Sequence, residues 1–386
     1  MRICVVYDCL FPHTVGGAER WYANLAERLA ADGHEVAYLT LRQWPRGERP
    51  RIDERVEVIC AGPRMALYTN DGRRRILPPL TFGLGVLWHL LRKGRRYEVV
   101  HTASFPYFSL LAAGVTRALG RFALVVDWHE VWSRAYWREY LGPVGGAIGY
   151  AVQLACTRLP QRAFCFSRLH AARLRDEGLR GELTVLAGEY AGPLEPAPPE
   201  TAEPRVVFAG RMIPEKRAPL GVAGVAAAAG RIPGLRGIFF GDGPERGAVL
   251  EAITAEARRA AIAAPGFVDS AEVDAAVRKA LCMLLPSRRE GYGMVVVEAA
   301  CRGTPSVVVA GEDNAATELV EEGVNGFIVA EASAEAIAAA IERVHEAGMG
   351  LRESTAAWFA RHAQRLSLEH SLQIVLESYG ASSARR

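Results

Sequence analysis

The segment Ser287 to Gly303, SRREGYGMVVVEAACRG, places two glutamates on either side of a glycine-containing turn. Glu290 precedes the turn, and Glu298 follows it in a stretch with the composition of a helix. Free amides at the start of such a helix suit the negative charge of a diphosphate. Glu298 is positioned to accept hydrogen bonds from ribose hydroxyls, while Glu290 can offset positive charge that develops on an anomeric carbon.

This unit follows the apolar run LCMLLP, which predicts a strand. A strand, a loop and a helix in this order place Glu290 and Glu298 at the carboxyl edge of a parallel sheet, where doubly wound folds bind ligands. The simpler interpretation is two surface glutamates beside a tight turn. The glycines interrupt the spacing, so the pair cannot be one face of a single helix, and this favours a functional role.

A second group of polar residues lies in FAGRMIPEK, where a predicted strand runs into a glycine turn at Gly210 and a helix is expected to start near Pro214. Lys216 is one of only three lysines in a chain with 46 basic residues, which hints that an ammonium group is required there. With the guanidinium of Arg211 it would neutralise a departing diphosphate. A merely solvated basic helix start would oppose the helix dipole.

Short β-rich runs alternate with Ala- and Leu-rich stretches along the 386 residues, a pattern that predicts parallel strands with crossover helices. The alternation stops at a proline-rich, acidic segment and then resumes. We therefore predict an α/β protein of two Rossmann-like domains. The expected divisions are an N-terminal domain at 1–190, a linker at 191–204, a second domain at 205–350 and C-terminal helices at 351–386.

Composition excludes several other classes of protein. Hydrophobic residues make up 50% and charged residues 23% of the chain, which is ordinary for a globular enzyme. The seven cysteines form no C-x-x-C pair, no His cluster has metal-ligand spacing, and the N-terminus reads as a strand rather than a signal peptide. A cytoplasmic location is expected. Basic residues are not gathered in a recognition motif, so nucleic-acid binding is not expected.

The segment 73–96 is apolar between basic flanks and too short to span a bilayer. It could dock on an anionic membrane at the inner face or receive a lipid-linked acceptor, or it could be a core helix with an arginine-rich exit. Aromatic residues at 105–108 and at 128–137 could form a stacking wall for a sugar or aglycone, or simply belong to the core.

Four motifs together carry a family resemblance. GGAE, AGRMIPEK, GDGPE and EGYGMVVVEA occur in the order and at the separations seen in the retaining glycosyltransferases of family 4. The resemblance covers nearly the whole chain and is strongest in its second half. It implies the GT-B fold, in which the parallel sheets of two Rossmann-like domains face each other across a donor-binding cleft. It also implies that the C-terminal helices cross back to the first domain.

The resemblance implies a role for each matching residue. Arg211 and Lys216 would bind the donor diphosphate, Glu298 the ribose and Glu290 the transferred sugar. Further donor contacts would come from the glycine loops of both domains and from backbone amides, namely Gly16, Gly17, Gly210, Gly291, Tyr292, Gly293, Met294 and Val295. Family members generally need no metal ion, so neither a metal nor another cofactor is expected.

One residue departs from the family pattern. Many members have a histidine two residues after the position of His101, where this chain has Ala103. His129 is the better candidate for a catalytic histidine near the acceptor, with Asp127 and Glu130 as helpers, although a packed histidine is nearly as plausible. The expected route is a same-face displacement in which the leaving phosphate oxygen helps to deprotonate the acceptor.

The expected function is therefore transfer of a sugar from a nucleotide-sugar, with UDP favoured by resemblance, to a hydroxyl of a glycan, lipid-linked intermediate or small natural product. Two alternatives stay open. A nucleotide-sugar epimerase or hydrolase of the same fold would act without an acceptor. A non-catalytic partner would bind the sugar nucleotide only.

Overall fold

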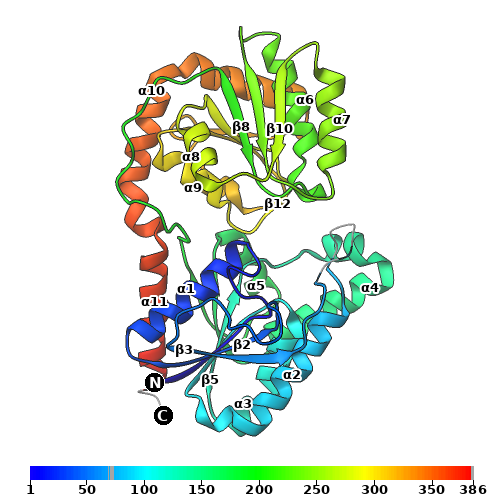
Figure 1. Ribbon diagram of the computed structural model, residues 1–386, viewed down its shortest axis with the longest axis vertical. Helices are drawn as coiled ribbons and strands as arrows, with labels where there is room; N and C mark the ends of the chain where they lie inside the picture. Colours follow the sequence, from blue (N-terminus) through cyan, green and yellow to red (C-terminus); the bar gives the residue numbers. More distant parts are fainter. Residues whose placement is uncertain (68, 70–73, 384–386) are drawn as a thin grey trace. The chain divides into compact units, whose positions relative to one another are not determined.

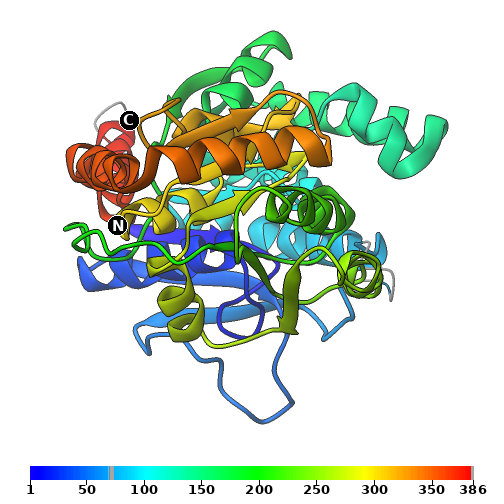
Figure 2. The same cartoon turned by 90° about the horizontal axis from the view of Figure 1, so that it is seen from above.

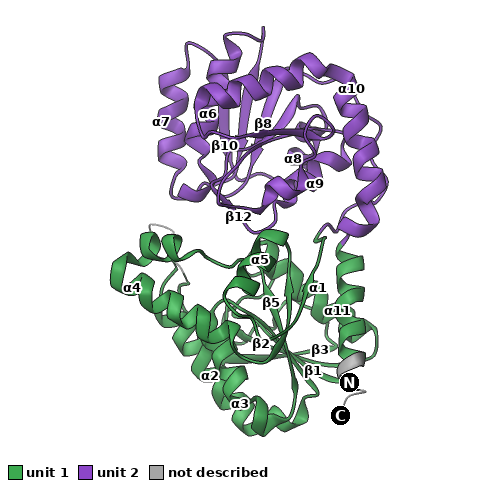
Figure 3. Ribbon diagram, turned by 180° about the vertical axis from the view of Figure 1, so that it is seen from behind, with its two compact units in different colours: residues 1–69, 73–189, 368–386 green, residues 70–72, 190–367 purple. Residues whose placement is uncertain are grey.

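The computed structural model describes residues 1–67, 69 and 74–383, which form two α/β units (Figure 1). Unit 1 consists of the chain up to residue 189 together with the C-terminal segment from Leu368 (Figure 3). The described residues of unit 2 are 190–367. The chain thus passes between the units twice.

Unit 1 is built on a parallel sheet of seven strands in the order β3-β2-β1-β4-β5-β6-β7. Its strands are β1 (Arg2–Val6), β2 (Glu35–Leu41), β3 (Val56–Gly62), β4 (Val99–Ala103), β5 (Ala123–Trp128), β6 (Gln161–Cys165) and β7 (Gly181–Val185). The strand order reverses between β1 and β4, which are neighbours through pairs such as Val6 with Thr102. In a doubly wound fold this reversal marks the ligand-binding edge.

Helices cover both faces of this sheet, with α1 and α11 on one side and α2 and α3 on the other (Figure 1). This distribution follows from the right-handed crossovers between parallel strands. The helices are α1 (Gly17–Ala31), α2 (Leu77–Lys93), η1 (Gly94–Arg96), α3 (Tyr107–Gly120), α4 (Arg134–Thr157), α5 (Arg168–Asp176) and α11 (Leu368–Ser383).

Unit 2 has a parallel sheet of six strands in the order β10-β9-β8-β11-β13-β15, and a separate pair, β12 and β14. The strands are β8 (Arg205–Ala209), β9 (Arg236–Phe240), β10 (Ala261–Gly266), β11 (Cys282–Leu285), β12 (Arg289–Glu290), β13 (Ser306–Val309), β14 (Asp313–Asn314) and β15 (Gly326–Val329). The helices are η2 (Pro214–Lys216), α6 (Ala218–Ala229), α7 (Arg246–Glu256), α8 (Ser270–Arg278), α9 (Met294–Cys301), η3 (Ala315–Leu319) and α10 (Ala334–Leu366).

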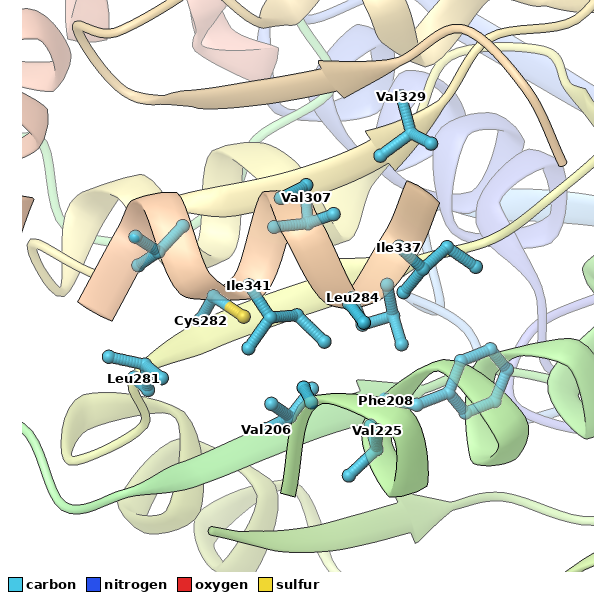
Figure 4. Packing of buried hydrophobic residues seen from close by; sticks show 14 of the residues in the cluster. Val206, Phe208, Val225, Leu281, Cys282, Leu284, Val307, Val329, Ile337 and Ile341 are labelled. Atoms are coloured by element: carbon cyan, nitrogen blue, oxygen red, sulfur yellow. The ribbon is translucent and has the colours of Figure 1, made fainter. Parts of the chain in front are cut away.

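The core of unit 2 lies between its sheet and the helices α6 and α10 (Figure 4). Phe208 of β8 and Leu284 of β11 are fully buried there against Val225 of α6 and Ile341 of α10. Strands buried on both faces are near-continuous apolar runs, which is why the sequence shows them clearly. Figure 2 shows α10 as a long helix that runs across unit 2.

The return to unit 1 begins at Leu368, whereas the sequence predicted C-terminal helices from 351. Gly348, with φ of 56°, interrupts α10 but does not end its packing on unit 2. The buried Arg352 side chain donates to the carbonyl oxygens of Ala280 and Arg278, both at 2.6 Å. α11 belongs to unit 1, where the hydroxyl of Ser371 donates to the backbone oxygen of residue 188 at 2.6 Å.

Two glycine loops of unit 2 approach each other more closely than any side chain would allow. Gly241 has φ of 125°, and a Cβ there would lie 1.9 Å from the backbone oxygen of Gly210. The Gly210 amide in turn donates to the Phe240 oxygen at 3.1 Å. The GDGPE motif that starts at Gly241 therefore supports the loop after β8.

Gly241→Ala is expected to destabilise the protein by roughly 2 to 3 kcal/mol, because the strained backbone and the contact with Gly210 cannot both be relieved. Thermal unfolding followed by circular dichroism measures the loss. Gly247→Ala, in α7 with nothing within 4 Å of its Cβ position, is the matched control and should leave the midpoint nearly unchanged. Equal midpoints for both variants would contradict the close approach.

Candidate functional site

The two groups of polar residues in unit 2 follow neighbouring strands. β8 pairs with β11 through Val206 with Cys282 and Val207 with Met283, although the strands are far apart in sequence. From this pair the sheet grows to β9 and β10 on one side and to β13 and β15 on the other. The loops after β8 and β11 therefore meet at the strand-order reversal, where α/β sheets bind ligands.

Lys216 and Glu290, predicted from separate motifs, are in direct contact. The Lys216 Nζ donates to Glu290 Oε1 at 2.5 Å, and both side chains are largely buried. A backbone hydrogen bond of 2.8 Å from Arg288 to the Glu215 oxygen fixes the two loops beside this pair. Burial strengthens an ion pair of this kind and holds the ammonium in one place.

The local structure around Lys216 differs in one respect from the prediction of a helix near Pro214. Pro214–Lys216 form the short 3-10 helix η2, and α6 begins at Ala218. Arg217 lies between them with φ of 49°, so the chain turns and the two helices are separate. Arg211 is exposed in the loop after β8, and the amide of Met212 is held by the Asp242 oxygen at 2.9 Å.

Helix α9 starts directly after the glycine turn, as predicted. Gly293 precedes it with φ of 99°, and a Cβ there would lie 2.5 Å from the Cβ of Ala316. Among the residues that the structure describes, no side chain caps this helix start, and its first turn holds no acidic residue. The first amides, at Met294 and Val295, are thus available to an anion and carry the positive end of the helix dipole.

The remaining predicted residues of this loop keep the expected places. Gly291 is half-buried and Tyr292 is buried in the turn, and Glu290 itself belongs to the two-residue strand β12. Glu298 is half-buried and is the fifth residue of α9, one turn beyond the helix start.

Asn314 supports the turn and was not found from the sequence. This buried side chain donates to the backbone oxygens of Ser287 and Val309 at 2.9 and 2.8 Å, and it accepts from the Ala316 amide at 3.0 Å. Its strand β14 pairs with β12, which carries Glu290. A single asparagine in a loop has no spacing signal, so only the structure shows this role.

In unit 1 the glycine pair begins α1, as predicted. Gly16 is the residue before the helix and Gly17 is its first residue. A Cβ on Gly16 would lie 2.3 Å from Glu19 Oε2, so the Glu19 carboxylate packs against bare backbone. Burial raises the pKa of Glu19, and nearby Asp8 acts in the same direction. Neither carboxylate was predicted from the sequence.

His129 lies close to this glycine pair. Its Nδ1 is 3.5 Å from Glu189 Oε1, and a Cβ on Gly17 would lie 4.0 Å from Glu189 Oε2. The ring stacks on Phe166 with centroids 4.6 Å apart. Burial by itself lowers the pKa of His129, but the carboxylate of Glu189, followed by others nearby, more than offsets this and raises the pKa. Glu189 was not identified from the sequence.

The two predicted helpers of His129 make other contacts. Asp127 is fully buried, accepts from the Trp21 indole at 2.6 Å, and lies 2.8 Å from His101 Nε2. Burial by itself raises the pKa of Asp127, but the neighbouring imidazole outweighs burial and keeps the pKa low. Glu130 accepts from the Trp132 indole at 2.9 Å. The negative charge of Asp127 thus contributes to the raised pKa of His129 without a direct contact being needed.

His101 is part of the core. It is fully buried, and its Nδ1 is hydrogen-bonded to the hydroxyl of Tyr379 in α11. Ala103, at the position where a histidine is usual, is buried at the end of β4. Across the described ranges, no group of three or more His, Cys, Asp or Glu side chains is arranged to hold a metal ion.

Two Rossmann-like units, each with a glycine loop and charged residues at the edge where its strand order reverses, define a GT-B glycosyltransferase. Two family models match the chain. The one described as Glycosyltransferase Family 4 matches residues 15–211, and the one described as Glycosyl transferases group 1 matches residues 195–358. The chain belongs to glycosyltransferase family 4.

Several known proteins are similar to this chain, and the solved structures among them share its fold. Glycogen synthase of Mycobacterium tuberculosis (strain CDC 1551 / Oshkosh) is 26% identical over 376 residues, covering 89% of this chain and 86% of the synthase. Sucrose-phosphate synthase from Thermosynechococcus elongatus matches over 100% of both chains with a TM-score of 0.77 and 18% identity. HepE of Anabaena in complex with UDP has a TM-score of 0.71 and 20% identity, covering 99% of this chain and 100% of HepE.

Glu189→Gln is expected to lower the pKa of His129, because the carboxylate that favours the charged ring is gone. A raised folded-state pKa means that protonation of His129 stabilises the fold fully below the ordinary pKa of about 6.5. That stabilisation is lost as the pH rises through the folded-state pKa. Imidazole titration by NMR measures the shift, and Glu54→Gln, at an exposed glutamate of unit 1, is the control. An unchanged His129 titration would contradict the pairing.

Proposed function

We propose that this glycosyltransferase transfers a sugar from a UDP-sugar to an acceptor hydroxyl with retention of anomeric configuration and without a metal ion. The observation that carries the proposal is the Lys216–Glu290 pair beside the uncapped start of α9. A cation, a carboxylate and free amides at one strand-order reversal match the diphosphate and sugar of such a donor. HepE of Anabaena is described in complex with UDP and with UDP-glucose, which supports the choice of nucleotide.

The diphosphate would be bound by positive charge from two sources. Lys216 and Arg211 supply an ammonium and a guanidinium, and the amides of residues 291–295 supply hydrogen-bond donors with the helix dipole behind them. These groups stabilise the charge that grows on the departing diphosphate, which is the main electrostatic demand of the reaction. Glu298 would accept from the ribose hydroxyls, and Gly210 would let the backbone approach the donor.

At the reacting centre, the acceptor oxygen would attack the anomeric carbon from the face that the diphosphate leaves. The bond from the anomeric carbon to the phosphate oxygen breaks as the new glycosidic bond forms. The departing phosphate oxygen takes the proton of the acceptor hydroxyl, so the products are the glycoside and UDP. Glu290, held by Lys216, would accept from hydroxyls of the sugar and stabilise its positive charge.

Unit 1 would bind the acceptor. His129, with a raised pKa and Glu189 beside it, would contact the sugar or the acceptor, and Gly16 and Gly17 would allow close approach of backbone. The acceptor class proposed is a glycan, a lipid-linked intermediate or a small natural product. The proposed location is the cytoplasm, with peripheral contact at the inner membrane face through 73–96, of which Arg73 lies outside the described residues.

A thermal-shift panel of UDP-, GDP-, ADP- and dTDP-sugars tests the donor site. UDP-sugars are expected to raise the melting temperature of the wild type, because a ligand that binds only the native state stabilises it. Lys216→Ala and Glu298→Ala should lose this increase. Lys279→Ala and Glu251→Ala, at exposed positions of the same unit, are matched controls that should keep it.

The panel separates the alternatives. Stabilisation by another nucleotide would overturn UDP but keep the site, and no shift with any donor would overturn the donor assignment. A donor that is hydrolysed or isomerised without an acceptor would instead indicate a hydrolase or epimerase. Binding without turnover of any acceptor would favour a non-catalytic binding partner.

Retention and metal independence are tested on the reaction itself. The product is expected by proton NMR to keep the anomeric configuration of the donor sugar, and kcat/KM should be unchanged by EDTA. Lys216→Ala is expected to lower kcat/KM by about 100-fold or more, the order seen when one charge-stabilising donor is removed. An inverted product or loss of activity in EDTA would contradict the mechanism.

A further inference from the structure

Exposed large apolar side chains form a stripe along α2 of unit 1. They recur every three or four residues, the spacing of one helix face, and comprise Leu77, Leu80, Leu84, Trp88 and Leu91. The side chains of Leu84 and Trp88 are 67% and 58% exposed. The opposite side of the same helix is buried in unit 1 through Phe82, Val86 and Leu90. The stripe is therefore a second apolar face of α2, which remains exposed to solvent.

The neighbouring helices also carry exposed large apolar side chains. α3 packs against both α2 and α4, and the exposed apolar residues of these two helices are Val115, Leu119, Leu141, Val144 and Ile148. Of the sixteen exposed large hydrophobic residues in the described part of the chain, ten lie on α2, α3 and α4. Scattered apolar residues on a surface need no explanation, but this concentration on adjoining helices indicates a binding surface. We call these ten residues the apolar face.

Basic residues predominate around α2 and α3, while α4 carries the exposed Glu139 two residues before Leu141. Residues 74–126, which contain α2 and α3, include eight basic residues and a single acidic one, Glu98. Four of the basic residues are exposed at the end of α2 and directly after it, namely Arg92, Lys93, Arg95 and Arg96. The Arg92 guanidinium lies over the Trp88 ring, 3.6 Å from its centroid. No charged residue lies between Leu141 and Thr157 in α4.

We propose that the apolar face docks on the surface of an anionic lipid bilayer. Exposed leucine, valine and isoleucine side chains would enter the boundary between headgroups and acyl chains, and Trp88 suits the headgroup level. The basic residues at the end of α2 would contact anionic headgroups, each adding to the attraction. Within the described ranges, no helix has the length and apolarity required to cross a membrane.

Charge complementarity favours a bilayer over a second copy of this chain. Two copies that met through this face would bring two sets of exposed arginines together with little acidic charge to oppose them. An anionic bilayer can interact with both kinds of residue, because its acyl chains accept the apolar side chains and its headgroups neutralise the basic ones. The proposal deepens, and rests on, the membrane contact through 73–96 that the proposed function includes. It does not rest on the proposed donor or mechanism, because membrane docking needs neither donor nor acceptor.

Sedimentation with lipid vesicles tests the proposal on the full chain. The wild type is expected to bind vesicles of phosphatidylcholine with phosphatidylglycerol, and to bind pure phosphatidylcholine vesicles much less. Binding should fall as salt is raised, since salt screens the contribution of the arginines. The thermal shift by a donor sugar, measured in parallel without vesicles, reports separately on the donor site.

Two double substitutions test the apolar residues and the basic residues of this surface separately. Leu84→Glu with Trp88→Glu is expected to lower the vesicle partition coefficient at least tenfold, and Phe267→Glu, at a 79% exposed residue of unit 2, should not change it. Arg92→Gln with Arg96→Gln should lower binding to anionic vesicles by about fivefold for each charge removed. Arg258→Gln, an exposed arginine of unit 2, is its control.

Each other outcome overturns the proposal. If the wild type binds neither kind of vesicle, or if the substituted and control proteins bind equally, the face has another role. Analytical ultracentrifugation without vesicles adds an independent readout. A wild-type dimer that becomes monomeric with Leu84→Glu and Trp88→Glu would assign the face to a second copy. Unchanged melting temperatures exclude unfolding as the cause.

Discussion

The pairing of β8 with β11 is the constraint on which the geometry of the candidate site in unit 2 depends. Two strands, β9 and β10, lie between them in sequence, yet β8 and β11 are hydrogen-bonded neighbours in the sheet. Their carboxyl ends therefore bring Lys216 and Glu290 into contact and set the start of α9 beside them. Supporting contacts, from Asn314 to the backbone and from Gly241 to Gly210, act on the loops that this pairing brings together.

Unit 1 repeats the same arrangement with different chemistry. Its strand order reverses between β1 and β4. The loop after β1 carries Asp8 and leads to Glu19 in the first turn of α1, and His129 follows the next strand, β5. Beneath them a buried network joins Trp21, Asp127, His101 and Tyr379. A buried carboxylate is tolerated only when it is paired and hydrogen-bonded, so this network holds the negative charge of Asp127 below His129.

The sequence predicted most of the fold because its strands are buried on both faces and read as apolar runs. Residues fixed by a motif, such as Lys216, Glu290 and Gly293, could be located because glycines and charges at a strand end leave a local pattern. Glu189 and Asn314 could not, because their roles arise from tertiary proximity. The sequence predicted C-terminal helices from 351, whereas unit 2 continues to Ser367. A glycine within α10 resembles a helix end, but Arg352 beyond it is held by backbone oxygens of unit 2.

The double passage of the chain between the units has a consequence for biosynthesis. Unit 1 includes α11, whose Tyr379 is hydrogen-bonded to His101 and whose Ser371 binds the backbone at residue 188. A ribosome therefore releases all of unit 2 before it supplies the last element of unit 1. During that interval the Nδ1 of His101 lacks its Tyr379 partner, and the face of the sheet that α11 covers is incompletely covered. Unit 2, which is continuous in sequence, can complete its core first, so the order of folding need not follow the order of synthesis.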